Sequence, residues 1–257
     1  MLKSETISEI RERFGNAGIG ELKDLIHCYG EDSRSTVQQL VNRSRSRIAA
    51  YEKEVARTAK LWEYERRYEE YSAICGIDEV GRGPLAGPVV AGAVILPKNC
   101  DLLFINDSKK LSEKKREELY AQIMERAVAV GIGTASHERI DAINILQATY
   151  EAMREAISNL SVLPDILLND AVTIPGIDIP QIPIIKGDAK SISIGAASIV
   201  AKVTRDRMMV EYDRLYPGYG FGDNKGYGSA VHIEALKRLG PCPIHRHSFI
   251  RNFTQTD

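Results

Sequence analysis

Three apolar runs in the second part of the chain, each about the length of a β-strand, carry carboxylates at or near their ends. AICGIDEV contains Asp78 and Glu79, DILLND ends at Asp170, and QIPIIKGD ends at Asp188. A single aspartate after a strand is commonly a turn residue or a helix N-cap, so none of these acids is informative alone. Ligands bind at strand ends in open α/β sheets, so three strands that end in acids predict that these side chains meet at one site.

The segments around these strands predict an α/β fold. AICGIDEV and PVVAGAVIL flank a glycine turn as paired strands, and further strands then alternate with helices that have apolar faces. This order predicts a mixed β-sheet with helices on its faces over residues 72–257. Residues 1–71 are charge-dense and helical in pattern, with a glycine turn at residues 15–20, and predict an N-terminal helical extension.

Four carboxylates at one edge of a sheet need a counter-charge. Two carboxylates about 4 Å apart repel by roughly 4 kcal/mol at an effective dielectric constant of about 20. Divalent cations relieve this repulsion, and a set of oxygen donors without clustered His or Cys favours Mg²⁺ or Mn²⁺ over zinc. Adjacent strand residues point to opposite faces, so Asp78 and Glu79 can share a site only where the strand bends or ends, and Gly81 could supply the bend.

The turn Gly81-Arg82-Gly83, which follows the first two acids, predicts a site for phosphate or sugar oxygens. Its glycines tolerate unusual dihedrals and expose backbone N–H groups, and Arg82 adds a charged donor. A plain strand turn explains this motif on its own. The neighbouring carboxylates favour the binding interpretation, because a polyanionic substrate needs such donors near its metals.

A glycine-rich segment near the C-terminus, YPGYGFGDNKGYGS, interleaves aromatic residues with a cation. This composition suits stacking on bases or sugars, and Tyr227 and Lys225 are the candidates. Tyr219 and Phe221 are predicted to cover the core instead. The triplet HRH at 245–247 has no third metal ligand nearby and is interpreted as phosphate-facing or structural.

Charge and cysteine content restrict the class of protein. Lys+Arg 34 against Asp+Glu 35 gives a net charge of −1, although residues 225–251 hold five cations and one anion and predict a local basic face. The four cysteines are far apart, with no C-x-x-C pair and no secretory signal, which predicts reduced thiols in a cytoplasmic protein. No apolar run approaches the ~20 residues of a membrane span, so we expect no membrane role.

Five segments together resemble bacterial ribonuclease HII, the type 2 ribonuclease H: GIDEVGRGPLAGPVVAGAVIL, DSKKLS, KGDAKSISIGAASIVAKVTRDRMM, GYGFGDNKGYGS and GPCPIHRHSF. The resemblance covers about residues 73–249 and implies a ribonuclease H-like fold whose C-terminal helical part binds substrate. It implies a metal-dependent endoribonuclease that hydrolyses the RNA strand of RNA/DNA hybrids and cuts 5′ of single ribonucleotides in duplex DNA. It further implies two metal ions, 3′-hydroxyl and 5′-phosphate products, a monomer, a role in ribonucleotide excision repair, and an unknown partner in replication or transcription.

The same resemblance implies roles for individual residues. The acids that match the catalytic and metal-binding tetrad are Asp78, Glu79, Asp170 and Asp188. The turn that recognises the ribose 2′-OH, the group that distinguishes RNA from DNA, matches Gly81, Arg82 and Gly83. Tyr227 matches a tyrosine that stacks on the neighbouring deoxyribose.

The chain departs from the family pattern at Asn169, Gly195 and Ser229, and Asn169 could redirect the Asp170 carboxylate. Ribonuclease HIII is an alternative that Asp188 and the helical leader argue against. Two other classes stay open: a junction resolvase of the same fold would lack the 2′-OH contact, and a non-catalytic module would bind hybrids without cutting them. Residues 1–71 are expected to pack as an appendage, with a dedicated binding module as the alternative.

Overall fold

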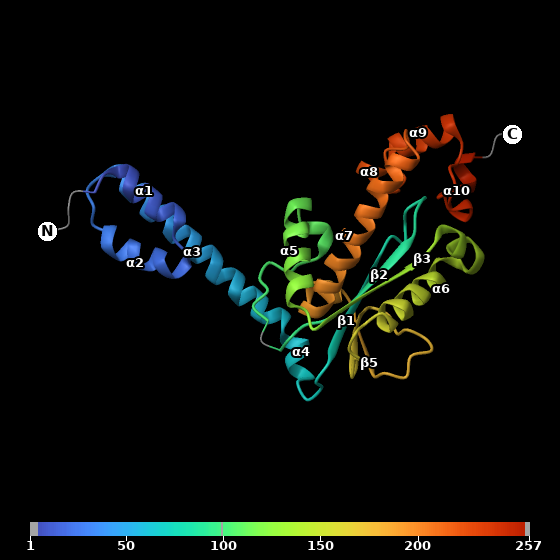
Figure 1. Ribbon diagram of the computed structural model, residues 1–257, viewed down its shortest axis with the longest axis horizontal. Coiled ribbons are helices and arrows are strands. Elements are labelled where there is room, and N and C mark those ends of the chain that lie inside the picture. Colours follow the sequence, from blue (N-terminus) through green and yellow to red (C-terminus); the bar gives the residue numbers. More distant parts are fainter. Residues whose placement is uncertain (1–4, 99, 255–257) are drawn as a thin grey trace. The chain divides into compact units, whose positions relative to one another are not determined.

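The structure is a computed structural model that describes residues 5–98 and 100–254 and divides into two compact units, Met1–Lys60 (unit 1) and Leu61–Asp257 (unit 2). Unit 1 contains three helices, of which the third ends on the first residue of unit 2: α1 (Ile7–Asn16), α2 (Ile19–Tyr29) and α3 (Ser35–Leu61). Figure 1 labels these and the other elements.

Unit 1 has an apolar core of its own. Its buried apolar side chains come from all three helices and from the residue that follows α1, Ala17: Ile10, Phe14, Ala17, Leu22, Val37, Val41 and Ile48. α1 begins at a capping box, in which Thr6 and Glu9 satisfy each other's backbone N–H groups. α2 lies partly in the segment expected to be a turn, because the Glu21 carboxylate accepts a hydrogen bond from the Gly18 N–H at 2.8 Å and so starts a helix there.

Unit 2 is built on a five-stranded mixed sheet with the order β3-β2-β1-β4-β5. The strands are β1 (Ile74–Val80), β2 (Val89–Ile95), β3 (Ala129–Ala135), β4 (Ile166–Asp170) and β5 (Gln181–Ile184). β1, β2 and β3 are antiparallel neighbours, whereas β4 pairs in parallel with β1 and with β5. The predicted α/β class and mixed sheet are therefore confirmed.

Helices cover both faces of this sheet (Figure 1). The helices of unit 2 are α4 (Glu63–Arg67), α5 (Glu113–Arg126), α6 (His137–Ser158), α7 (Ile192–Leu215), α8 (Phe221–Asn224), α9 (Ala230–Leu239) and α10 (His247–Thr254). α6 packs on the face that carries Cys75 and Ile77. α7 packs on the other face, so closely that a Cβ on Gly76 would lie 2.1 Å from the Ser193 carbonyl carbon.

Two short 3₁₀ turns complete the description, at Ser108–Lys110 (η1) and Gly187–Ala189 (η2). Asp188 lies in η2, whereas β5 already ends at Ile184. The prediction that a strand runs up to Asp188 is therefore wrong, since Lys186 adopts a left-handed conformation (φ 59°) that ends the extended chain. Within the described part of the chain, no helix is both long and apolar enough to cross a membrane.

Candidate active site

The sheet topology brings three of the acid-bearing segments to the same edge. β1, β4 and β5 run parallel to one another, so their carboxyl ends lie on one side of unit 2. The register pairs Ile77 with Asn169, which places Asp78 level with Asp170 and on the same face of the sheet. Asp188 follows β5 at that edge, in η2.

Asp78 is the most buried of the four acids, with 6% of its surface exposed. It lies on the α7 face of β1, and its Oδ1 accepts a hydrogen bond from the Glu79 N–H at 2.8 Å. Burial, followed by the charges of Glu79 and Asp170, raises the pKa of Asp78 well above its usual value, although the Ser198 hydroxyl opposes this shift. The carboxylate is thus held in a place where its charge is poorly compensated by the protein.

Glu79 approaches the edge from the other face of β1. The strand continues to Val80, so the bend expected at Gly81 comes only after both acids. The Glu79 Oε1 accepts a hydrogen bond from Arg82 Nη1 at 3.2 Å, and this guanidinium partly opposes the rise that burial causes in the pKa of Glu79. The Asp170 charge acts on Glu79 as well as on Asp78, so the three carboxylates form one electrostatic group.

Asp170 is oriented by the backbone of the next segment. Its Oδ1 accepts a hydrogen bond from the Gly187 N–H at 2.7 Å, which connects the end of β4 to η2. Asn169 does not redirect it, because the two side chains lie on opposite faces of the strand. The Asn169 Nδ2 donates to Gln181 Oε1 at 2.8 Å on the α6 face, and its buried Oδ1 has no partner among the described residues.

Asp188 is half-buried, and two residues that were not predicted from the sequence as site residues lie near it. Burial, followed by the charges of Asp107 and Asp170, raises the pKa of Asp188, while Lys109 opposes the shift. Asp107 also caps η1, since its carboxylate accepts from the Lys109 N–H at 3.0 Å. The segment DSKKLS contributed to the family resemblance without a role for single residues, and the charges of Asp107 and Lys109 lie close enough to Asp188 to act on its pKa.

The acids fit a hard divalent cation. All four donors are carboxylates, and burial together with mutual repulsion raises the pKa of Asp78, Glu79 and Asp188. In residues 5–98 and 100–254, no three His, Cys, Asp or Glu side chains are already arranged as a coordination group. The acids therefore lie at the same edge of the sheet, and the protein does not neutralise their negative charge. A complete set of metal ligands would need further oxygen donors, such as those of a phosphate.

The Gly81-Arg82-Gly83 turn follows β1 directly and lies against Tyr227. Gly81 has φ +91°, and a Cβ there would lie 2.3 Å from Arg205 Nε, so this position requires glycine. Gly83 has no positive φ, and the nearest atom to a Cβ there would be Tyr227 Cε1 at 3.9 Å. No described residue comes close enough to demand glycine at 83, and Tyr227, of which 42% is exposed, lies next to the open space there.

Two fully buried arginines fix this turn to the C-terminal part of unit 2. Arg246 donates to the carbonyls of Gly81 (2.5 Å), Arg82 (2.9 Å) and Gly87 (2.9 Å). Arg205, on α7, donates to three further carbonyls: those of Pro88 (2.8 Å), Lys225 (2.8 Å) and Ala86 (3.1 Å). Neither forms an ion pair with a described carboxylate, and burial lowers the pKa of Arg246 to about 9 and that of Arg205 to about 10.

The burial of Arg246 bears on two predictions. Of the five cations expected to form a basic face over residues 225–251, Lys237, Arg238 and Arg251 are exposed, whereas Arg246 is 0% exposed and its charge is directed at backbone carbonyls of the turn. The HRH triplet is structural at its first two positions, since His245 is also buried and lies with Nε2 3.0 Å from His232 Nε2. The His232 Nδ1 contacts the Tyr227 carbonyl at 2.9 Å and so supports the same turn.

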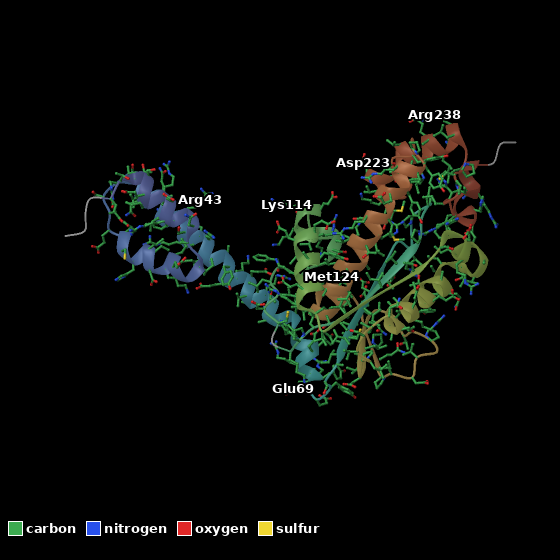
Figure 2. All side chains as sticks on the ribbon, in the orientation of Figure 1. Arg43, Glu69, Lys114, Met124, Asp223 and Arg238 are labelled. Carbon is green, nitrogen blue, oxygen red and sulfur yellow. The ribbon has the colours of Figure 1, made fainter. Side chains whose placement is uncertain are left out.

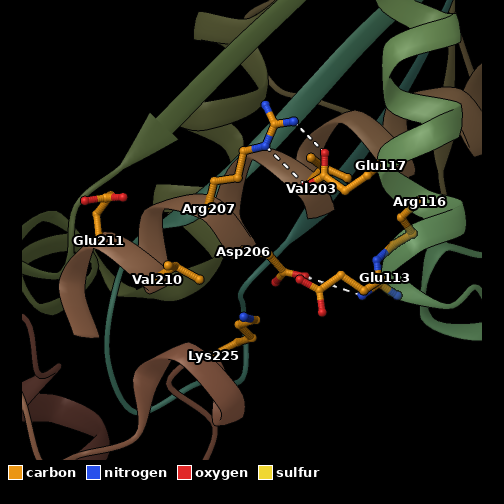
Figure 3. Close-up of a pocket in the computed structure, with 9 residues that line it drawn as sticks. All are labelled: Glu113, Arg116, Glu117, Val203, Asp206, Arg207, Val210, Glu211 and Lys225. Carbon is orange, nitrogen blue, oxygen red and sulfur yellow. Dashed lines mark hydrogen bonds and ion pairs between the residues drawn. The ribbon is translucent and has the colours of Figure 1, made fainter. Parts of the chain in front are cut away.

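Lys225 and two further aromatic residues of the glycine-rich segment, Tyr219 and Phe221, occupy different surroundings. Lys225 has φ 51° at the end of α8, and its Nζ donates to the Gly222 carbonyl. Figure 3 shows its side chain in a small concavity of about 130 Å³ beside Asp206, with α5 on the opposite wall. The prediction that Tyr219 and Phe221 cover the core is confirmed, since they are 6% and 0% exposed and their rings stack.

Comparisons with known proteins agree on one family. A family model described as Ribonuclease HII matches residues 75–252, and one described as Ribonuclease HII N-terminal domain matches residues 6–69. A ribonuclease HII of Lachnoclostridium phytofermentans is 64% identical over 253 residues, which cover 98% of each chain.

Solved structures show the same fold for the larger part of the chain. The ribonuclease H2 of Pyrococcus horikoshii has a TM-score of 0.58 at 26% identity and covers 72% of this chain and 100% of its own. The ribonuclease HII of Archaeoglobus fulgidus, solved in complex with PCNA, has a TM-score of 0.56 at 28% identity, with coverages of 72% and 98%.

Proposed function

The chain belongs to the ribonuclease HII family of metal-dependent ribonuclease H enzymes, and from this premise we propose that it cuts RNA/DNA hybrids and cuts 5′ of single ribonucleotides embedded in duplex DNA. The observation that supports this substrate most strongly is that the acid-bearing strand β1 leads directly into the glycine turn. β1 carries Asp78 and Glu79, and the turn that begins at Gly81 places Gly83 against Tyr227. An acidic edge for the scissile phosphate is thus adjacent in the chain to a surface on which a sugar can be recognised.

In this proposal the four carboxylates Asp78, Glu79, Asp170 and Asp188 hold Mg²⁺ or Mn²⁺. When bound, two such ions supply an activated water and stabilise the departing 3′ oxygen, which leaves 3′-hydroxyl and 5′-phosphate ends. The protein positions the acids: the Gly187 N–H orients Asp170, and the Glu79 N–H and the Ser198 hydroxyl orient Asp78. Arg82 lies at the same edge, bound to Glu79, where its guanidinium can transfer to a substrate phosphate.

Recognition of the ribonucleotide is assigned to the turn and to Tyr227. The 2′-OH is both donor and acceptor, and the backbone of Gly81, Arg82 and Gly83 offers partners for it beside an open space. The exposed Tyr227 ring supplies a stacking surface for the next sugar. Lys225 remains a proposed contact of the substrate backbone, from the position shown in Figure 3.

Substitution of the two glycines is expected to separate recognition from folding. In Gly83→Ala the new Cβ meets only Tyr227 at 3.9 Å, so the protein should melt as the wild type does. Cleavage at a single ribonucleotide should fall about 10-fold or more, roughly 1.4 kcal/mol in transition-state binding, because the methyl group fills the space left for the ribose. Gly81→Ala, the matched control, should instead lower stability by about 2 kcal/mol or more through its positive φ and its contact with Arg205.

Thermal melts and single-turnover cleavage of both variants measure this difference. A Gly83→Ala enzyme that cuts at the ribonucleotide as fast as the wild type would show that the turn does not approach the ribose.

Cleavage mapping tests the proposed substrate itself. A duplex with one embedded ribonucleotide, a continuous hybrid and an all-DNA four-way junction are incubated with the enzyme, with Mg²⁺ and Mn²⁺ in parallel. We expect a cut on the 5′ side of the ribonucleotide, cuts within the RNA strand of the hybrid, and an intact junction. Cleavage of the junction would support a resolvase, and binding without any cleavage would support a non-catalytic module.

The proposal includes a monomer that works in ribonucleotide excision repair in the cytoplasm. The acids, the turn and Tyr227 all lie in unit 2 of one chain, so no second subunit is needed to complete the site. The complex of the Archaeoglobus fulgidus relative with PCNA makes a sliding clamp the first partner to test by co-elution.

A further inference from the structure

We propose that a concavity on unit 1, lined by Arg11, Arg43 and Arg47, binds backbone phosphates of nucleic acid. The concavity measures about 380 Å³ and lies between α1 and α3. Arg11 comes from α1, and Arg43 and Arg47 are four residues apart on α3, so both lie on one face of that helix. All three side chains are exposed, and Figure 2 marks Arg43 on α3.

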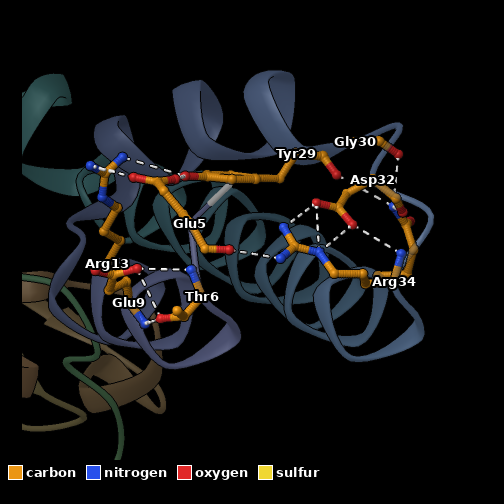
Figure 4. Close-up of polar contacts among 9 residues, drawn as sticks. Glu5, Thr6, Glu9, Arg13, Tyr29, Gly30, Asp32 and Arg34 are labelled. Carbon is orange, nitrogen blue, oxygen red and sulfur yellow. Dashed lines mark hydrogen bonds and ion pairs between the residues drawn. The ribbon is translucent and has the colours of Figure 1, made fainter. Parts of the chain in front are cut away.

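Among the described residues of unit 1, these three arginines gather in one concavity without counter-charges, whereas Arg45, Lys53 and Lys60, which also form no ion pair, lie outside it. Arg13 pairs with Glu5 at 2.7 Å, and Arg34 pairs with Asp32 at 2.6 Å, as Figure 4 shows. By contrast, no ion pair or hydrogen bond between described residues involves the side chain of Arg11, Arg43 or Arg47. The sequence has the same asymmetry, since four arginines and no carboxylate lie between Asp32 and Glu52.

The fold of unit 1 does not need this cluster. Its core is apolar, and like charges at i and i+4 destabilise a helix slightly, so Arg43 and Arg47 are a small cost to the free protein. An anion between the guanidinium groups would remove that cost. Arginine is the cation best matched to phosphate, because its planar group donates two parallel hydrogen bonds to phosphate oxygens.

The lining also indicates which part of a nucleic acid is contacted. Phe14 is the aromatic residue at the concavity, but it is only 4% exposed and packs into the core of unit 1. Bases therefore find no stacking surface among these residues, and the contact is to the sugar-phosphate backbone. Such a site is insensitive to sequence and to the 2′-OH, and it would add affinity for duplexes to the discrimination assigned to unit 2.

The identity of the ligand as nucleic acid rests on the proposed function, and the test uses the full-length protein. Arg11→Gln, Arg43→Gln and Arg47→Gln are combined in one variant. The control combines Lys23→Gln, Arg45→Gln and Lys53→Gln, which remove three positive charges from α2 and α3 outside the concavity. Fluorescence anisotropy in EDTA, where no cleavage occurs, measures binding to a labelled duplex with one ribonucleotide and to the matching all-DNA duplex over a range of KCl concentrations.

We expect the concavity variant to bind both duplexes about 10-fold or more weakly than the control variant at moderate salt. The slope of log K against log[KCl] should become shallower by about 2–3, because each lost phosphate contact releases about 0.9 fewer counterions. The turnover of the concavity variant at a saturating concentration of hybrid should equal that of the wild type. If the triple variant loses helical circular dichroism, Arg43→Gln/Arg47→Gln is compared with Arg45→Gln/Lys53→Gln, and a slope change of about 1–2 is expected.

Equal slopes and equal affinities for the concavity and control variants would overturn the proposal, as would a loss confined to the ribonucleotide-containing duplex. Failure of the proposed function is a separate result. If the wild type cut the junction and not the ribonucleotide, the substrate assignment to unit 2 would be lost while the salt dependence would still decide the phosphate site on unit 1.

Discussion

Asp78→Asn should remove nearly all turnover and at the same time make the metal-free protein more stable. The activity loss should be at least about 10³-fold, roughly 4 kcal/mol in the barrier, because Asp78 is the acid most deeply placed at the edge where the metal ions are proposed to bind. The stability gain follows from its surroundings. Burial and the charges of Glu79 and Asp170 raise the pKa of Asp78, so the ionised side chain opposes folding at neutral pH.

Asparagine keeps the shape of the side chain and can still accept the hydrogen bond from the Glu79 N–H. Removal of the charge should raise the free energy of unfolding by about 1 kcal/mol, or the melting temperature by about 2–4 °C. Single-turnover cleavage with Mg²⁺ and thermal melts in EDTA measure the two effects. The exposed Asp178→Asn serves as the control and should change neither. Turnover close to that of the wild type, or a less stable Asp78→Asn protein, would remove Asp78 from the metal site.

Arg246→Lys should have the second-largest effect, although it keeps the charge. The guanidinium donates to three carbonyls at once from donors in a fixed planar arrangement. The compact ammonium group of lysine, on a flexible aliphatic chain, cannot reproduce this arrangement. Buried carbonyls of the turn would lose their donors, each at a cost of roughly 1–3 kcal/mol. We therefore expect a destabilisation of about 2–4 kcal/mol and, well below the melting temperature, a fall of about 10-fold or more in cleavage at a single ribonucleotide.

A purely structural role for Arg246 is separated from a positioning role by two readouts. If Arg246 positions the turn, the folded variant should bind Mn²⁺ like the wild type. It should lose more activity on a single ribonucleotide than on a long hybrid, because a long hybrid offers many ribonucleotides at which the enzyme can bind and cut. Arg251→Lys, on the exposed side of α10, is the control. An equal loss on both substrates, together with weaker Mn²⁺ binding, would show that Arg246 only supports the fold.

The sheet and the acid-bearing strands could be predicted from the sequence because their signals are local. Apolar runs of strand length ended at Asp78–Glu79 and Asp170, and the predicted strands there are β1 and β4. A left-handed residue, Lys186, ended β5 early, and nothing in the apolar pattern QIPIIKGD marks that conformation. The assignment of the four acids as metal ligands remains a prediction.

Residues that act through long-range contacts could not be predicted. Glu65 lies in a charged run that suggests an exposed helix, yet it is 6% exposed and accepts from Ser191 Oγ at 2.6 Å and from the Ser193 N–H at 3.0 Å at the start of α7. Arg205 and Arg246 are similar cases, because an arginine in a sequence is expected at the surface and its backbone partners are far away in the chain. Only the fold shows which carbonyls they reach.

The most direct test of the carboxylate edge is Mn²⁺ binding followed by electron paramagnetic resonance in the presence of a duplex whose ribonucleotide linkage cannot be cut. Wild type, Asp170→Asn, Asp188→Asn and the control Asp178→Asn are titrated in parallel. We expect wild type and control to bind Mn²⁺ alike, with the duplex strengthening binding, and both edge variants to bind at least about 10-fold more weakly, a difference of roughly 1.4 kcal/mol. Mn²⁺ affinity that is the same in all four proteins would contradict a shared metal site at the ends of β1, β4 and β5.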